Sequence, residues 1–254
     1  MSQASLNAFE FTWSVEFAGR WTLQLRACPL QGKCFPDTVQ EQVNLALATI
    51  LRGPVRLRDY ALYVDGGRVW PPLTSNRSES AFAESPRQLH PPEVALSEDI
   101  RIGNCWESPQ MPSQLAVVLD QLIHPTNVTI DHIPLEIAAD IGEAPRHLLL
   151  WGVVEGTGNH GRYHDLRQAY QDPSPGAAAR FGPSLRSDTD TYALLADFTY
   201  DIHAPLHIQT FQIDPRVVES RMDFGLIVLE ILDNWGSNST CLYRLRIHGS
   251  DVEL

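Results

Sequence analysis

Alternating apolar and polar residues mark the start of the chain. Over residues 9–17 the apolar side chains fall at every second position, and the alternation resumes over residues 21–27 after a short break around Gly19. A period of two on both sides of a glycine-containing break is typical of two paired strands. The sequence therefore predicts a β-hairpin in this region.

The apolar spacing changes from residue 37 onward. Over residues 37–51 the apolar positions form a stripe with helical spacing, and Asp37 stands where a helix N-cap belongs. Gly53 and Pro54 then end the pattern. We predict an amphipathic helix over residues 37–51.

Strand patterns dominate the rest of the chain. They are rich in Val, Ile, Leu and aromatic residues and are separated by Pro, Gly and Asn. Short strands without intervening helices predict an all-β fold, an antiparallel β-sandwich or jelly roll. The predicted strands are residues 115–119, 127–133, 147–154, 193–200, 208–213, 224–232 and 241–248.

Two polar stretches interrupt these strands. Residues 71–93 are polar and rich in proline, and residues 155–191 form a long polar insertion in which we predict a short helix around residues 163–170. Loops of this length inside a compact domain are usually functional or disordered.

The last strand pattern has an unusual start. Alternation places Cys241, Tyr243, Leu245 and Ile247 on one face. A core strand needs neither a cysteine nor a tyrosine. The pair therefore either packs in the core like other buried side chains or belongs to a functional site.

Composition narrows the functional classes. The chain has 254 residues and a net charge of -12, which argues against a nucleic-acid-binding protein. No apolar run approaches the roughly 20 residues of a membrane-spanning helix, and the first residues lack the pattern of a secretory signal. We expect the chain taken alone to be soluble.

Few residues carry a recognisable catalytic or metal-binding pattern. His160 with His164, and His203 with His207, have the spacing of helical metal ligands, but we interpret both pairs as unrelated surface histidines. The sequence contains no nucleophile elbow, phosphate-binding loop or dinucleotide-binding glycine motif.

Two of the four cysteines are more informative. Cys105 and Cys241 each lie near an aromatic residue and a predicted strand, in IGNCW and TCLY. They are either two buried free thiols or a disulfide. A disulfide between them would close a loop of 136 residues, for which a chain-entropy model gives about 4 to 5 kcal/mol.

Several strings in order and spacing resemble one known family. They are DYALYVDGGRVW (59–70), EDIRIGNCWE (98–107), TIDHIP (129–134), APRHLLLWG (144–152), LLADFTYDIHAPLHIQTFQI (194–213) and ILDNWGSNSTCLYRLRIHG (231–249). Together they resemble a SUN domain of the filamentous-fungal type, the luminal module of inner-nuclear-membrane bridge proteins. The resemblance covers roughly residues 37–250, and GNCW together with TCLYR-x-R-x-HG is its most specific part.

The resemblance implies an adaptor rather than an enzyme. SUN domains are β-sandwiches that form homotrimers and bind the C-terminal tail of a KASH protein across the nuclear envelope. The tail adds a strand beside a lid hairpin, and its terminal carboxylate enters a polar pocket. The implied organisation is an N-terminal extension (1–36), a helix preceding the domain (37–55) and the SUN domain (56–254), with its lid at about residues 71–91.

The resemblance also assigns a peptide-binding pocket. It places His132 and Tyr243 there, with Glu143 where a serine is usual and Ser239 where a tyrosine is often found. A glutamate beside a peptide carboxylate would repel it. Arg77 stands about where some members carry a lid cysteine, so we expect no covalent link to the partner.

A cation loop closed by a disulfide between Cys105 and Cys241 is implied as well. Backbone carbonyls would hold a monovalent cation, K⁺, because carbonyl oxygens suit such an ion better than a transition metal. The implied ligands are Val94, Ser97, Asp99, Asn104, Cys241 and Tyr243.

The resemblance also implies where the protein works. In full-length members the domain lies in the perinuclear space, and we expect membrane contact only through segments absent from this chain. Two alternatives stay open: a SUN-like protein of the endoplasmic reticulum acting in membrane-protein quality control, and a carbohydrate-binding jelly roll.

Overall fold

A computed structural model of the chain describes residues 9–16, 20–27, 57–75, 90–169 and 182–252. The chain divides into two compact units, residues 1–56 and residues 57–254.

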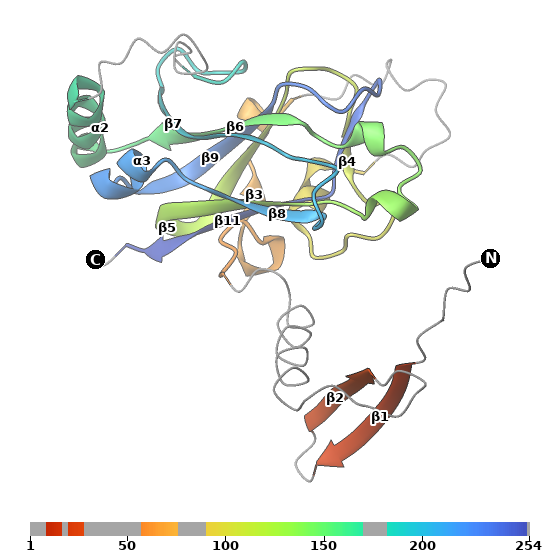
Figure 1. Ribbon diagram of the computed structural model, residues 1–254. Helices are drawn as coiled ribbons and strands as arrows, with labels where there is room; N and C mark the ends of the chain where they lie inside the picture. The colour runs from red at the N-terminus through yellow and green to blue at the C-terminus, as the bar shows by residue number, and fades with distance from the viewer. Residues whose placement is uncertain (1–8, 17–19, 28–56, 76–89, 170–181, 253–254) are drawn as a thin grey trace. The chain divides into compact units, whose positions relative to one another are not determined.

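The described part of the first unit is a β-hairpin (Figure 1). Strand β1 (Phe9–Glu16) pairs antiparallel with β2 (Arg20–Ala27), with Phe9 opposite Ala27 and Glu16 opposite Arg20. The hairpin predicted from the alternation is therefore present. The predicted helix at 37–51 lies outside the described residues.

The second unit is an antiparallel β-sandwich, as the strand pattern predicted. Figure 1 shows its two layers, with β6, β7 and β9 in one and β8 and β11 in the other. The strands are β3 (Arg68–Val69), β4 (Trp106–Ser108), β5 (Ser113–Asp131), β6 (His147–Val154), β7 (Thr191–Thr199), β8 (Ile208–Gln212), β9 (Phe224–Ile231), β10 (Thr240–Leu242) and β11 (Arg244–Asp251).

Strand β5 belongs to both layers. Its first half pairs with β9, from Ser113 opposite Ile231 to Val118 opposite Leu226, and its second half pairs with β11 and β8. The register with β9 shifts between Val118 and Ile123, and a strand that changes sheets at such an irregularity makes a corner of a sandwich. The two strands predicted at 115–119 and 127–133 are thus one long strand.

The pairing of β5 with β11 contains a second irregularity. The register shifts between His248 and Gly249, where Gly249 lies opposite Pro125. A Cβ atom at Gly249 would come within 2.4 Å of the backbone oxygen of His124. Only glycine therefore permits the two backbones to approach this closely.

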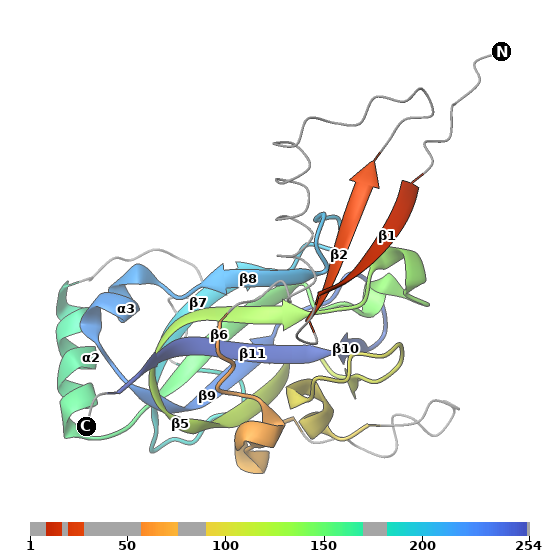
Figure 2. The same ribbon diagram turned by 90° about the horizontal axis from the view of Figure 1, so that it is seen from below.

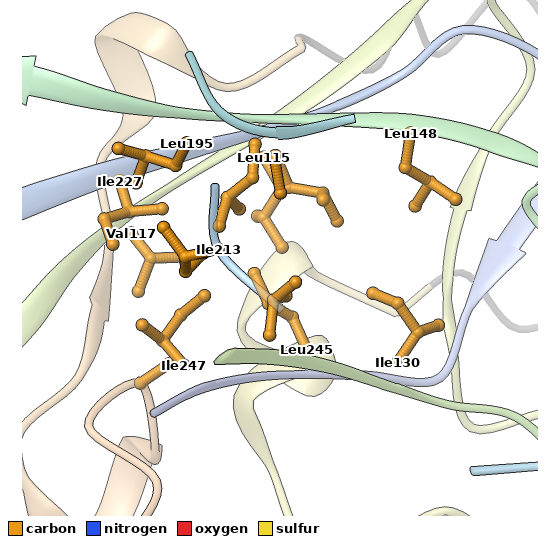
Figure 3. Packing of buried hydrophobic residues seen from close by; sticks show 14 of the residues in the cluster. Leu115, Val117, Ile130, Leu148, Leu195, Ile213, Ile227, Leu245 and Ile247 are labelled. Carbon is orange, nitrogen blue, oxygen red and sulfur yellow. The ribbon is translucent and has the colours of Figure 1, made fainter. Parts of the chain in front are cut away.

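The main core fills the space between the two layers (Figure 3). Leu115, Leu148 and Ile227 come from one layer, and Ile130 and Leu245 from the other, and all five are fully buried. Burial of aliphatic side chains on this scale is the main stabilising contribution to the fold.

The outer face of the β9–β6 layer is buried as well. Trp151 and Val228 lie in a second apolar cluster, and beside them Glu230 is fully buried and accepts a hydrogen bond from Trp151 Nε1 at 3.1 Å. The backbone N–H of Ser184 donates to Glu230 Oε1 at 3.0 Å, and Gln114 Nε2 donates to the backbone oxygen of Leu185 at 2.7 Å. The end of the predicted polar insertion therefore covers this face.

The last predicted strand requires a correction. It is divided at Tyr243 into two strands, β10 and β11 (Figure 2). Strand β10 pairs with β4, and β11 pairs with β5. Cys241 and Tyr243 lie in a small cluster of their own, whereas Leu245 and Ile247 lie in the main core. The prediction that these four residues share one face was wrong, because a change of pairing partner interrupts the alternation.

The two α-helices of the described second unit were predicted only in part. Helix α2 (Thr157–Ala169) begins six positions before the helix predicted around residues 163–170. Helix α3 (Pro215–Ser220), which Asp214 caps by accepting from the N–H of Arg216 at 2.9 Å, was not predicted. No described helix is both long and apolar enough to cross a membrane.

Candidate functional site

A pocket of about 520 Å³ lies where β4 and β10 meet the loops around residues 101–105 and 133–143. Its wall combines segments that are far apart in the sequence. The lining residues are His90, Arg101, Ile102, Gly103, Asn104, Cys105, Glu107, His132, Ile133, Ala138, Ala139, Asp140, Glu143, Cys241 and Tyr243.

A disulfide joins two sides of this pocket. Cys105 and Cys241 are bonded, with their Cα atoms 5.5 Å apart, as the resemblance implied. Cys241 is also held by strand pairing, since it lies opposite Glu107 in the β4–β10 ladder. The bond and the ladder together fix the loop before β4 against β10.

Tyr243 ties the next part of the wall together. Its hydroxyl oxygen accepts a hydrogen bond from the backbone N–H of Gly103 at 3.1 Å. Its ring meets that of His132 edge to face, with the centroids 4.8 Å apart. Tyr243 therefore links the 101–105 loop to the end of β5.

His132 is held as a neutral imidazole. Its side chain is buried, and its Nδ1 lies 3.0 Å from the backbone oxygen of Ile133. Because a carbonyl oxygen only accepts, Nδ1 carries the proton and Nε2 is an acceptor. Burial lowers the pKa of His132, and this outweighs the hydrogen bond to Ile133. Nε2 is buried and has no hydrogen-bond partner among the described residues.

Glu143 and Ser239 are the two positions that depart from the family pattern. Glu143 is half-buried and ends the 3-10 helix η6 (Ile141–Glu143) at the pocket wall. Ser239 does not line the pocket, but its hydroxyl donates to Glu107 Oε1 at 3.0 Å, and Glu107 does. The structure therefore brings three of the four predicted peptide-binding residues into one pocket and places the fourth beside it.

Hydrogen bonds order the predicted cation loop. The backbone oxygen of Val94 accepts from the N–H of Ser97 at 3.0 Å, and that of Asp99 accepts from Asn104 Nδ2 at 2.7 Å. A carbonyl oxygen has two lone pairs, so both retain capacity for a cation. Asp99 also pairs with Arg101, and hydrogen bonding from Arg101 lowers the pKa of Asp99. A carbonyl-rich donor set fits K⁺, so these residues remain compatible with the implied ion.

Other predicted elements fall elsewhere. Most of the predicted lid at 71–91, including Arg77, lies outside the described residues. His160 and His164 lie on α2, and His203 and His207 lie in the connection from β7 to β8. In the part of the chain that the structure describes, no three His, Cys, Asp or Glu residues are grouped to hold a metal ion.

Sequence reasoning missed three charged residues of the pocket wall. Arg101, Glu107 and Asp140 all line it. They come from loops and a short edge strand, where neither the helical nor the strand period applies, so no periodic pattern marks them. Asp140 carried one local signal, because aspartate is a favoured N-cap residue: it caps η6, and its Oδ1 accepts from the N–H of Gly142 at 2.9 Å.

Comparisons with known proteins identify the family of this chain. A family model described as Sad1 / UNC-like C-terminal matches residues 85–167 and 180–251. SUN domain-containing protein 1 of Homo sapiens is 29% identical over 227 residues, which cover 83% of this chain and 24% of that protein. SUN domain-containing protein 2 of Mus musculus is 30% identical over 224 residues, which cover 84% of this chain and 26% of that protein. The chain therefore belongs to the Sad1/UNC-like family, the SUN domain proteins.

The chain corresponds to part of its relatives. It spans about a quarter of the human protein and 56% of SUN domain-containing protein 3 of Bos taurus, to which it is 26% identical over 240 residues, 87% of this chain. Among solved structures, a family 32 carbohydrate-binding module from Streptococcus pneumoniae EndoD covers 76% of this chain and is itself covered in full, at 11% identity and a TM-score of 0.46.

Proposed function

We propose that this chain is an adaptor that binds the C-terminal tail of a KASH protein and so helps to bridge the nuclear envelope, linking nucleus to cytoskeleton. One observation carries the proposal. His132, Glu143 and Tyr243, which the family pattern assigns to tail binding, line one pocket beside the Cys105–Cys241 disulfide. These residues come from separate loops and strands, so their meeting is a property of the fold.

The pocket offers a physical basis for tail capture. Extended peptides bind by main-chain hydrogen bonds along a sheet edge, and a chain end is held by polar groups in a closed recess. Strand β10 pairs with β4 in a separate two-stranded sheet, at the pocket wall. In the proposed complex the tail runs past this short sheet and its carboxylate enters beside Tyr243 and Gly103.

The disulfide supports a luminal location. Disulfides persist in oxidising compartments and are rare in the cytosol. The domain is proposed to work in the perinuclear space, as a homotrimer. The mass of the protein in solution, measured with and without a peptide, tests the trimer.

A pair of peptides tests tail capture. Two copies of one proline-rich KASH-type tail, one with a free C-terminal carboxylate and one amidated, are titrated into the protein by calorimetry. The free tail is expected to bind more tightly, by about tenfold or more, because a charge-assisted hydrogen bond is lost on amidation. Equal binding of the two peptides would refute capture of the carboxylate.

The monovalent cation is a separate part of the proposal. The loop from Val94 to Asn104 would hold K⁺ through backbone carbonyls and so stiffen the wall next to Cys105. Thermal unfolding in KCl and in tetramethylammonium chloride at equal ionic strength tests it. A higher melting temperature in KCl is expected, because an ion that binds only the folded state stabilises it. Identical melting curves would argue against a cation site.

A further inference from the structure

The net charge of the described pocket wall has the same sign as the terminal carboxylate of a peptide. Among the described lining residues are three carboxylates, Glu107, Asp140 and Glu143, and one guanidinium, Arg101. These four described residues together carry a net charge of -2 when histidines are not counted. A peptide carboxylate would add a further negative charge beside these described residues, whose net charge is already negative.

The hydrogen bonds of Glu107 and Asp140 leave the negative charge of these two carboxylates in place. Glu107 accepts from the hydroxyl of Ser239 at 3.0 Å, and Asp140 accepts from the hydroxyl of Ser237 at 2.7 Å and from a backbone N–H. These donors are neutral, so they orient the carboxylates without compensating their charge.

The one guanidinium of the described wall is already paired. Arg101 binds Asp99 through its Nε at 2.8 Å from Oδ1, and through Nη2. Asp99 does not line the pocket, so this pair draws the positive charge of Arg101 away from the wall.

His132 adds another acceptor at a more buried position. His132 lines the pocket, and its Nε2 is buried and has no partner among the described residues. Because Nδ1 donates to the backbone oxygen of Ile133, Nε2 carries an unprotonated lone pair. A buried acceptor without a partner costs free energy, which a ligand with an N–H or O–H group would recover.

We infer that this pocket selects a peptide tail with a lysine or arginine within its last three residues, whose side chain pairs with the wall carboxylates while the tail donates a hydrogen bond to His132 Nε2. The inference rests on the proposed tail binding and names its substrate class. A basic side chain next to the chain end offsets both the wall and the terminal carboxylate. It also gives Glu143, which stands where the family usually has a serine, a direct part in specificity.

Matched peptides test the inference. Three tails with the same proline-rich sequence and a free C-terminus carry Lys, Gln or Glu at the residue before the last. Calorimetric titration of the full chain at low salt is expected to give the highest affinity for the Lys tail, a lower one for the Gln tail and the lowest for the Glu tail. The affinities for the Lys and Glu tails are expected to differ by about tenfold or more. Raising NaCl to 1 M is expected to reduce the differences in affinity among the three tails, because the Debye length falls to about 3 Å and the charges are screened.

Variants identify the carboxylates responsible. Glu107→Gln and Glu143→Gln keep the shape of the side chain and one acceptor oxygen but remove the charge. Each is expected to reduce the ratio of the affinities for the Lys and Gln tails by about twofold to fivefold, the range for a partly exposed charge pair. Glu155→Gln is the matched control, because Glu155 is exposed beyond the other end of β6 and does not line the pocket. It is expected to leave the ratio unchanged.

The outcomes separate the two proposals. If the free carboxylate is required but the three tails bind equally, the inference fails and tail capture stands. If the Lys tail binds best whether or not it is amidated, the acidic selection stands and carboxylate capture fails. Binding of none of the tails contradicts both. A ratio that falls equally in Glu155→Gln overturns the assignment to this pocket.

Discussion

The hydroxyl oxygen of Tyr243 accepts a hydrogen bond from the backbone N–H of Gly103 at 3.1 Å, although the two residues are 140 positions apart. Gly103 has a φ of +83°, a conformation that side chains rarely adopt, so the loop that presents this N–H depends on glycine. Tyr243 thus secures a loop that the Cys105–Cys241 disulfide also holds two residues later.

Replacing Tyr243 by Phe removes this acceptor and keeps the ring. Loss of one such hydrogen bond is expected to destabilise the fold by about 1 kcal/mol and to weaken binding of a free-carboxylate tail several-fold. Urea unfolding and calorimetric titration measure the two effects. Tyr63→Phe, at an exposed tyrosine outside the pocket, is the control. Unchanged tail binding in Tyr243→Phe would exclude its hydroxyl from recognition.

Removing the disulfide is expected to cost much more. The Cys105→Ala/Cys241→Ala variant loses a cross-link over 136 residues, for which chain entropy gives about 4 to 5 kcal/mol. The midpoint of guanidinium unfolding should fall accordingly, with similar destabilisation of the unmodified protein under reducing conditions. A loss below about 1 kcal/mol would show that the bond constrains the unfolded chain little.

The buried ion pair between Arg246 and Asp131 gives a third prediction. Arg246 Nε lies 3.0 Å from Asp131 Oδ1, and Asp131 is fully buried. Asp131→Ala leaves a largely buried guanidinium without its partner and is expected to cost about 3 to 5 kcal/mol. The exposed pair of Arg146 and Asp233 offers a control, and Asp233→Ala should cost less than about 1 kcal/mol. Similar losses in both variants would contradict this account.

Stability should fall as the pH drops below about 6.5. Burial lowers the pKa of both His132 and His248 from the ordinary value of 6.5. Below that value the unfolded chain binds protons that the folded chain does not, so the free energy of unfolding decreases by up to about 1.4 kcal/mol per pH unit for each histidine. Above pH 7.5 both states are neutral and no dependence from these groups is expected.

Unfolding midpoints at pH 7.5, 6.5 and 5.5 measure this dependence. His132→Asn is expected to flatten part of the slope, whatever its effect on total stability. His164→Asn, at a side chain 68% exposed on α2, should leave the slope unchanged. Equal slopes for the protein and His132→Asn would mean that His132 titrates alike in both states.

Much of the fold could be predicted from the local spacing of apolar residues and from turn residues. The continuous apolar run at 147–154 and the alternation at 9–17 gave β6 and β1 almost to the residue, because strand period and turn residues are local properties. The family strings also placed Cys105, His132 and Tyr243 in one site. The sequence missed α3, a six-residue helix too short to show a period, and it read β5 as two strands because the corner around residues 119–122 breaks the alternation.

What the sequence determined by itself was the class of fold, most of the strands and the identity of the pocket's family residues. Only the tertiary structure decided the charge of the pocket. Arg101 and Asp140 reach it from loops and Glu107 from the short strand β4, and none of them shares a period with His132 or Tyr243. The division of the last strand at Tyr243 was decided in the same way, because β10 pairs with β4 and β11 with β5. Pairing partners and proximity in space are set by long-range packing, which no local pattern encodes.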